Sequence, residues 1–139
     1  MHSALVALEI VGQLNKTAID SNSIIKNHGL GESEPSIEKL VNIAKEQSFR
    51  ARLKSLTPSE IASYPLPCIA QTKEGSYVVV LKIDKEKETM LLFGAGKTEP
   101  YVMSYADFSQ NMNKRVIILK HRVLNDQIKF GFMWFYVVL

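Results

Sequence analysis

The sequence predicts an α+β domain in which helices come first and an antiparallel sheet follows. In residues 3–47, apolar residues recur at spacings of three and four, which is typical of amphipathic helices. From residue 49 onward, short alternating or apolar runs are separated by turn-forming residues, as in strands. Helices and strands that segregate in this way form an α+β fold. The 139 residues are enough for one domain with its own hydrophobic core.

Three helices are expected in the first part, and each has a local signal. Apolar residues lie on one helical face of the first, Gly29 is a typical left-handed cap after the second, and Ser36 is a typical N-cap before the third. A polar loop, 30–35, separates the second helix from the third. The helices are expected over residues 3–14, 17–28 and 36–47.

The sheet is expected to begin at residue 49 with a strand that has one basic face. Residues 49–56 alternate apolar side chains with the cations Arg50, Arg52 and Lys54. Residues 57–60 then read Thr-Pro-Ser-Glu, a capping box with an N1 proline that predicts one helical turn. A second turn is expected after Ser104. The remaining strands are expected over residues 68–71, 76–83, 88–93, 101–103 and 116–120, with a charged hairpin turn at 84–87.

Composition excludes several classes of function. A net charge of +3 is too small for the dense basic face of a nucleic-acid-binding protein, although it suits a cytoplasmic surface near anionic lipid. The single cysteine, Cys68, excludes an internal disulfide and is compatible with a reducing compartment. The N-terminus has no basic stretch followed by an apolar one, so we expect no signal peptide.

No cofactor or metal site is expected. His2, His28 and His121 are far apart in the sequence and lack neighbours at ligand spacing, so we expect exposed histidines. Residues 94–98 read Gly-Ala-Gly-Lys-Thr, but the spacing of a phosphate-binding loop is absent and a proline follows at once. Cys68 enters an apolar strand, which favours a buried, unreactive thiol.

The C-terminal run 130–139 carries no charge. As a helix it would be about 15 Å long, half the thickness of a bilayer core. Trp134 and Tyr136 are residue types that favour the membrane interface. Two interpretations stay open: the start of a transmembrane segment, or a strand or helix packed into the domain's own core.

Four short phrases, in this order, are similar to the C39 peptidase domain at the N-terminus of some ABC exporters. They are residues 5–10 (LVALEI), 74–81 (EGSYVVVL), 92–94 with 99–100 (LFG and EP), and 129–135 (KFGFMWF). The resemblance covers nearly the whole chain and implies a papain-like fold. It also implies a C39-like domain over 1–124, with 125–139 as a linker and the start of the first transmembrane segment.

The resemblance places Ser3 at the family's catalytic cysteine, Tyr77 at its histidine and Gly94 at its aspartate. A serine hydroxyl needs a neighbouring base to become a nucleophile. A tyrosine, with an ordinary pKa near 10, is a poor base at neutral pH, and glycine can orient nothing. The family's oxyanion-hole glutamine would lie before residue 1. We therefore expect a degenerate triad, no catalytic residue and no enzymatic activity in this domain.

The loss of all three catalytic residue types resembles the C39-like domains of hemolysin-type type I secretion transporters. Those domains hold an unfolded RTX toxin or adhesin before transport. That resemblance implies a non-catalytic docking domain at the cytoplasmic face of the bacterial inner membrane. It implies four partners: an unfolded RTX protein, the remainder of the homodimeric ABC transporter, a periplasmic adaptor and an outer-membrane channel. Members of that branch often keep the histidine, so Tyr77 departs from their pattern.

The candidates for substrate binding are three tyrosines and two arginines. The aromatic rings could stack on a bound chain, and the cations could attract acidic calcium-binding repeats. The alternative without substrate binding is that Tyr77 packs in the sheet and that the arginines form a solvated strand face. Two other functions stay open: a peptidase that uses Ser3 or Cys68, and a regulatory or scaffolding module of the transporter. The candidates are Tyr77, Tyr64, Tyr101, Arg50 and Arg52.

Overall fold

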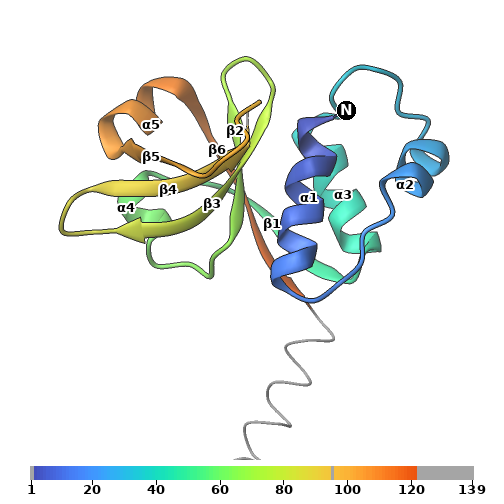
Figure 1. Ribbon diagram of the computed structural model, residues 1–139, viewed down its shortest axis with the longest axis horizontal. Coiled ribbons are helices and arrows are strands. Elements are labelled where there is room, and N and C mark those ends of the chain that lie inside the picture. The colour runs from blue at the N-terminus through green and yellow to red at the C-terminus, as the bar shows by residue number, and fades with distance from the viewer. Residues whose placement is uncertain (1, 95, 122–139) are drawn as a thin grey trace, which may run out of the picture.

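The computed structural model describes residues 2–94 and 96–121, and it confirms the order of helices followed by strands (Figure 1). The N-terminal helices lie on one side of the molecule, and the later, shorter helices lie on the other side. The helices are α1 (Ser3–Leu14), α2 (Ser21–His28), α3 (Ile37–Glu46), α4 (Pro58–Ile61) and α5 (Tyr105–Asn111).

The strands form one antiparallel sheet of six strands in the order β1-β6-β2-β3-β4-β5. β1 and β5 are therefore its edges, and the C-terminal strand β6 lies between β1 and β2. The strands are β1 (Phe49–Ser55), β2 (Cys68–Thr72), β3 (Tyr77–Asp84), β4 (Thr89–Gly94), β5 (Tyr101–Ser104) and β6 (Met112–His121).

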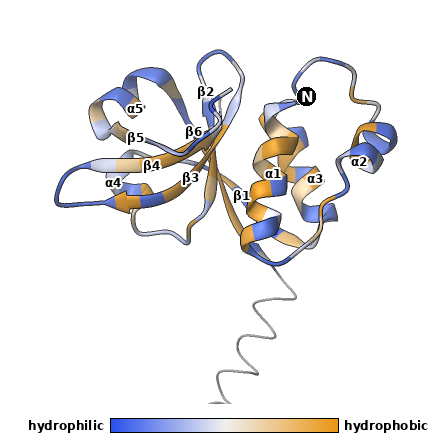
Figure 2. Ribbon diagram, in the orientation of Figure 1, coloured by the Kyte–Doolittle hydropathy of each residue, from blue (hydrophilic) through white to orange (hydrophobic). Residues whose placement is uncertain are grey.

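Each face of the sheet has its own hydrophobic core. α1 and α3 pack on one face, against side chains that include Tyr77 and Val79. α4 and α5 cover part of the other face, against side chains that include Val78 and Val80. Figure 2 shows the apolar colour on the strands and on α1 and α3. The unbroken apolar run of β3 follows from this arrangement, because a strand covered on both faces has no outward side.

Local capping signals placed the helix starts well, with one exception. Ser36 accepts a hydrogen bond from the Lys39 N–H, and the capping box at Thr57 is present as expected. The expected start of the second helix at residue 17 is wrong. Lys16 has a positive φ of 57°, and α2 begins at Ser21, after Asp20 accepts a hydrogen bond from the Ser23 N–H.

The last strand begins four residues before its expected start. β6 already pairs at Arg115 with the end of β1, and at Met112 with Thr72 of β2. The apolar pattern of β6 starts only at Val116. Its first four residues belong to the strand because they pair with residues of β1 and β2 that are distant in the sequence. None of the helices in the described ranges has the length and hydropathy that a bilayer crossing requires. The expectations for 125–139 lie outside the described residues.

Candidate functional site

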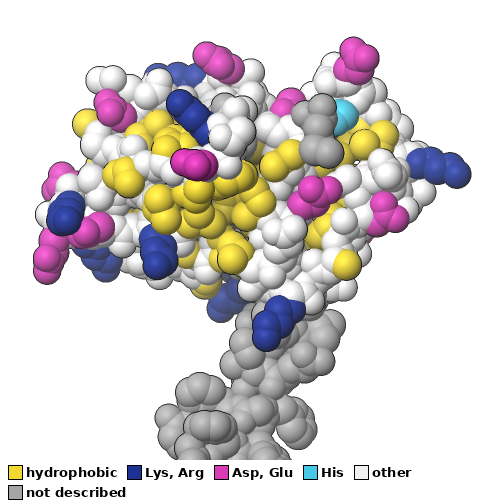
Figure 3. All heavy atoms as spheres, viewed as in Figure 1, with side chains coloured by type: hydrophobic (Ala, Val, Ile, Leu, Met, Phe, Trp, Pro, Cys, Tyr) yellow, Lys and Arg dark blue, Asp and Glu magenta, His cyan; other side chains and the backbone are white. Residues whose placement is uncertain are grey.

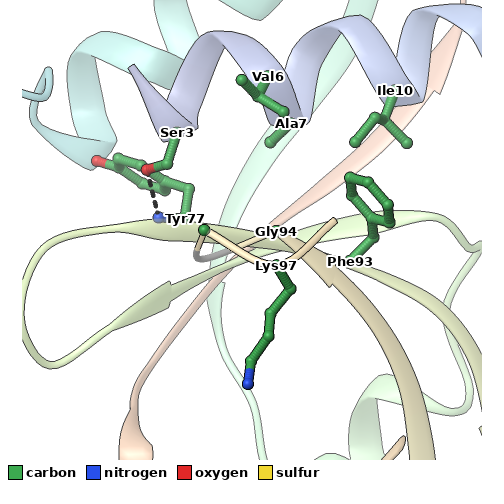
Figure 4. Close-up of a pocket in the computed structure, with 9 residues that line it drawn as sticks. Ser3, Val6, Ala7, Ile10, Tyr77, Phe93, Gly94 and Lys97 are labelled. Carbon is green, nitrogen blue, oxygen red and sulfur yellow. Dashed lines mark hydrogen bonds between the residues drawn. The ribbon is translucent and has the colours of Figure 1, made fainter. Parts of the chain in front are cut away.

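The three triad positions line one hollow between α1 and β4. This Ser3 hollow has a volume of about 260 Å³. Figure 4 shows Ile10 of α1 and Phe93 of β4 pointing toward each other across it, while Lys97 points away from the helix. The first helix and two neighbouring strands therefore bring together residues far apart in the sequence. The lining residues are Ser3, Val6, Ala7, Ile10, Tyr77, Phe93, Gly94, Gly96 and Lys97.

Ser3 is the first residue of α1, and both its polar groups are engaged. Its hydroxyl donates a hydrogen bond to Glu34 and accepts one of 2.9 Å from the Tyr77 N–H (Figure 4). Its backbone N–H donates to Glu34 Oε2 at 2.8 Å. Both the side chain and the amide of the nucleophile position are thus paired inside the domain.

Glu34 acts as the N-terminal cap of α1. His2, at the N-cap position, makes no capping hydrogen bond among the described residues. The Glu34 carboxylate instead accepts the N–H groups of Ser3 and, at 3.2 Å, of Ala4. A negative charge at this end also complements the helix dipole. Sequence reasoning missed this residue because it lies in an irregular loop, and 31 positions separate it from Ser3.

Tyr77 is fully buried, and its hydroxyl ties the loop before α3 to the sheet. The hydroxyl donates a hydrogen bond of 2.7 Å to the Pro35 carbonyl and accepts one of 3.2 Å from Gln71 Nε2. Burial raises the pKa of the Tyr77 phenol, and the carboxylates of Glu34 and Glu38 raise it further. The phenol is therefore a neutral structural group at physiological pH.

Gly94, at the position where the resemblance places the aspartate, lies where the backbone of β4 approaches β3 closely enough to crowd a side chain. Its φ is +126°, a value that L-residues rarely adopt. A Cβ atom there would lie 3.1 Å from the Tyr77 carbonyl oxygen and 3.3 Å from Val78 Cα. The backbone therefore disfavours an orienting carboxylate at this position.

The sheet face beside the Ser3 hollow is apolar and only partly covered. Val102 of the edge strand is 67% exposed and pairs with Leu91, which lies on the same face as Phe93. Figure 3 shows apolar side chains gathered in the middle of this side of the molecule, over β3 and β4 beside α1. We call this region the apolar surface, defined by Val6, Ile10, Leu91, Phe93 and Val102.

Both predicted arginines lie in a different hollow, on the opposite face of the sheet. Phe49 and Ala51 of β1 belong to the core under α1 and α3, so the alternate residues Arg50 and Arg52 face the other way. This basic hollow has a volume of about 330 Å³. Its lining residues are Arg50, Arg52, Lys54, Tyr64, Pro65, Ile118 and Lys120.

Tyr64 and Tyr101, the other two tyrosine candidates, do not line the Ser3 hollow with Tyr77. Tyr64 lies in the basic hollow, with Lys54 Nζ 5.3 Å from its ring centre. Tyr101 packs against the core under α4 and α5, with Lys97 Nζ 5.5 Å from its ring centre. Successive side chains of a strand point to opposite faces of the sheet. Because Val102 lies on the face of the apolar surface, Tyr101 points to the opposite face.

Cys68 is fully buried, as expected, and burial raises the pKa of its thiol to about 12. The expectation of exposed histidines is wrong for His2, which is 7% exposed, and His28 is only partly exposed, with 19% of its side chain accessible and Nε2 2.6 Å from Glu46 Oε2. The side chain of His121 lies outside the described residues. Within 2–94 and 96–121, no three His, Cys, Asp or Glu side chains are placed to hold a metal ion.

Comparison with known sequences relates the chain to toxin exporters. The chain is 28% identical over 139 residues to the leukotoxin export ATP-binding protein LtxB of Aggregatibacter actinomycetemcomitans. It is 23% identical over 133 residues to the alpha-hemolysin translocation ATP-binding protein HlyB of Proteus vulgaris. These matches cover 95% and 94% of the chain but 19% of each relative, so the chain spans about a fifth of their length.

Comparison with solved structures supports the same fold. The N-terminal peptidase C39 like domain of the toxin secretion ATP-binding protein from Vibrio parahaemolyticus matches with a TM-score of 0.76 and 18% identity. The match covers 87% of this chain and 98% of that one. A double glycine motif protease from an AMS/PCAT transporter, solved with its leader peptide, matches with a TM-score of 0.74 and 12% identity, covering 86% and 84%.

These neighbours confirm the papain-like fold expected from the resemblance. The sequence model of the Peptidase C39 family matches residues 1–123, a range that includes the last described strand, β6. The chain therefore belongs to the peptidase C39 family.

Proposed function

We propose that this domain holds an unfolded secreted polypeptide for a toxin-exporting ABC transporter and does not cleave it. Its membership of the C39 family and its similarity to toxin export proteins support the transporter context. The relatives are named for the export of leukotoxin and hemolysin, so the proposed cargo is an RTX-type toxin or adhesin.

The pairing of Ser3 with Glu34 carries the non-catalytic part of this proposal. Acyl transfer needs donors, often the nucleophile's own N–H, for the negative oxygen of the tetrahedral intermediate. Here the Ser3 N–H already donates to a carboxylate. An oxyanion beside Glu34 would meet a like charge instead of a free donor. The Ser3 hydroxyl also accepts the Tyr77 N–H, which occupies one of its lone pairs.

The apolar surface supports the docking part. An unfolded chain exposes apolar side chains that a folded domain buries, and a hollow of about 260 Å³ flanked by a partly covered sheet face can take such side chains. The hydroxyls of Ser3 and Tyr77 are hydrogen-bonded inside the domain. Affinity would therefore depend on apolar contact with little sequence specificity, which suits a site that must accept many segments of a long polypeptide.

The remaining parts of the proposal follow from the transporter context. The domain would lie at the cytoplasmic face of the bacterial inner membrane, with 125–139 as a linker and the start of the first transmembrane segment. It would act beside the rest of a homodimeric transporter, a periplasmic adaptor and an outer-membrane channel. ATP hydrolysis would belong to another part of that protein, because the chain has no Walker motif.

Titration of the ¹⁵N-labelled chain with an RTX segment, followed by NMR, tests the docking proposal. We expect shifts at Val6, Ile10 and Phe93 with the calcium-free, unfolded segment and none with the calcium-folded form. Equal shifts from both forms would contradict selective holding of an unfolded chain. No shift from either form would instead favour a module that contacts only its own transporter.

A further inference from the structure

The basic hollow gathers cations that form no ion pair with the described carboxylates. Within 2–94 and 96–121, the ion pairs join His28 to Glu46 and Arg115 to Glu38, and no cation of the basic hollow takes part in one. Lys45 adds a further exposed cation beside Arg50 and Arg52. A surface of this kind attracts anions.

The register of β1 and β6 places like charges directly opposite one another. Arg50 pairs with Lys120 across the two strands, and both side chains are exposed. Like charges at opposed positions destabilise a sheet, unless an anion lies between them. Arg52 is opposite Ile118 and adds a second guanidinium on the same face, and guanidinium groups match the geometry of phosphate oxygens.

The walls and the position of the hollow favour a membrane as the source of that anion. Tyr64 and Pro65 line it beside the cations, and an amphipathic ring beside basic residues is typical of the membrane interface. Lys120 is the last residue but one of β6, whose end lies beside β1 at the bottom of the domain (Figure 1). Eight residues, 122–129, separate β6 from the uncharged run 130–139 and can span at most about 30 Å.

We propose that the basic hollow binds the headgroups of anionic phospholipids and so holds the domain against the membrane. The opposite face of the sheet, with the apolar surface, then stays accessible to a polypeptide. This surface is independent of the Ser3 hollow, so it does not depend on whether the domain cleaves peptides.

Vesicle flotation of the 139-residue chain tests the proposal. We expect binding to phosphatidylcholine vesicles to strengthen when phosphatidylglycerol is included, and to weaken as salt is raised. The combined variant Arg50→Gln, Arg52→Gln, Lys120→Gln should bind the anionic vesicles roughly 100-fold more weakly, because three cations near the surface are lost. Both proteins should bind neutral vesicles equally, since the run 130–139 is unchanged.

The hairpin between β3 and β4 supplies a charge-matched control. Lys82→Gln, Lys85→Gln, Lys87→Gln removes three exposed cations elsewhere and should leave the preference for anionic vesicles intact. An equal loss in both triple variants, or no preference for phosphatidylglycerol, would overturn the proposal. Displacement of the chain from vesicles by polyglutamate, with tighter binding to polyglutamate through the same three cations, would assign the hollow to an acidic polypeptide instead.

Discussion

Glu34 and Ser3 are joined by two hydrogen bonds, although 31 positions separate them in the sequence. The Glu34 carboxylate accepts hydrogen bonds from the hydroxyl and the backbone N–H of Ser3. It also caps α1, the helix that begins at Ser3. The group that pairs with Ser3 is thus also the group that stabilises α1.

Replacing Glu34 with alanine should lower the free energy of unfolding by about 1–2 kcal/mol, the usual cost of losing an N-cap. Urea denaturation measures this change. Glu32→Ala is the matched control, because Glu32 is an exposed glutamate of the same loop. If the two variants lost equal stability, the capping role of Glu34 would be wrong.

Tyr77→Phe removes the hydroxyl that donates to the buried Pro35 carbonyl. We expect a loss of about 1–3 kcal/mol of stability, because an acceptor is left unpaired in the interior. Tyr105→Phe provides the comparison, since the Tyr105 hydroxyl is buried and has no hydrogen-bond partner within the described residues. That variant should keep or slightly raise the midpoint of urea unfolding. A Tyr77→Phe protein as stable as the wild type would argue against the link between sheet and loop.

Gly94→Ala should be destabilising for two reasons, an unfavourable φ and a crowded Cβ. Gly75→Ala measures the effect of φ alone, because Gly75 has a φ of +95° but no atom within 4 Å of a Cβ at that position. We expect Gly75→Ala to cost about 1 kcal/mol and Gly94→Ala to cost more, by thermal and urea unfolding. Equal losses would mean that β3 can move away, and that an orienting side chain could be accommodated after all.

Val102→Asp places a charge on the apolar surface and should weaken binding of an unfolded RTX segment by about tenfold, which corresponds to about 1.4 kcal/mol. Leu14→Asp is its control, because Leu14 is 57% exposed and lies outside that surface. Fluorescence anisotropy with a labelled segment measures both affinities. Unchanged binding to the Val102→Asp protein would move the docking site elsewhere.

The buried Cys68 thiol predicts a loss of stability at alkaline pH. Its pKa is raised from 9.0 to about 12, so the unfolded chain releases this proton at lower pH than the folded one. The free energy of unfolding therefore keeps its full value below pH 9.0 and decreases as the pH rises toward about 12. One pH unit above the unfolded value, the loss is about 1.4 kcal/mol. Cys68→Ala should show a shallower alkaline decline, and parallel curves would contradict this assignment.

Local patterns in the sequence predicted the helices and caps because capping and periodicity depend on neighbours within a few residues. Ser36 and Thr57 cap their helices as expected. Long-range contacts were less accessible. The hydrogen bonds between Glu34 and Ser3 could not be predicted, because Glu34 lies in an irregular loop without a sequence pattern. The position of Tyr64 in the basic hollow could not be predicted either, because it depends on the path of the chain after α4. The resemblance to the C39 family supplied what periodicity could not, the convergence of Ser3, Tyr77 and Gly94.

We propose that the Ser3 hollow and the apolar surface hold a polypeptide without cutting it. Intact-mass analysis, after incubation of the chain with a double-glycine leader peptide or an unfolded RTX segment, tests it most directly. We predict that both peptides keep their full mass, while the RTX segment is recovered bound to the chain. A cleavage product that disappears with Ser3→Ala or Cys68→Ala would contradict this account and assign a peptidase activity to the domain.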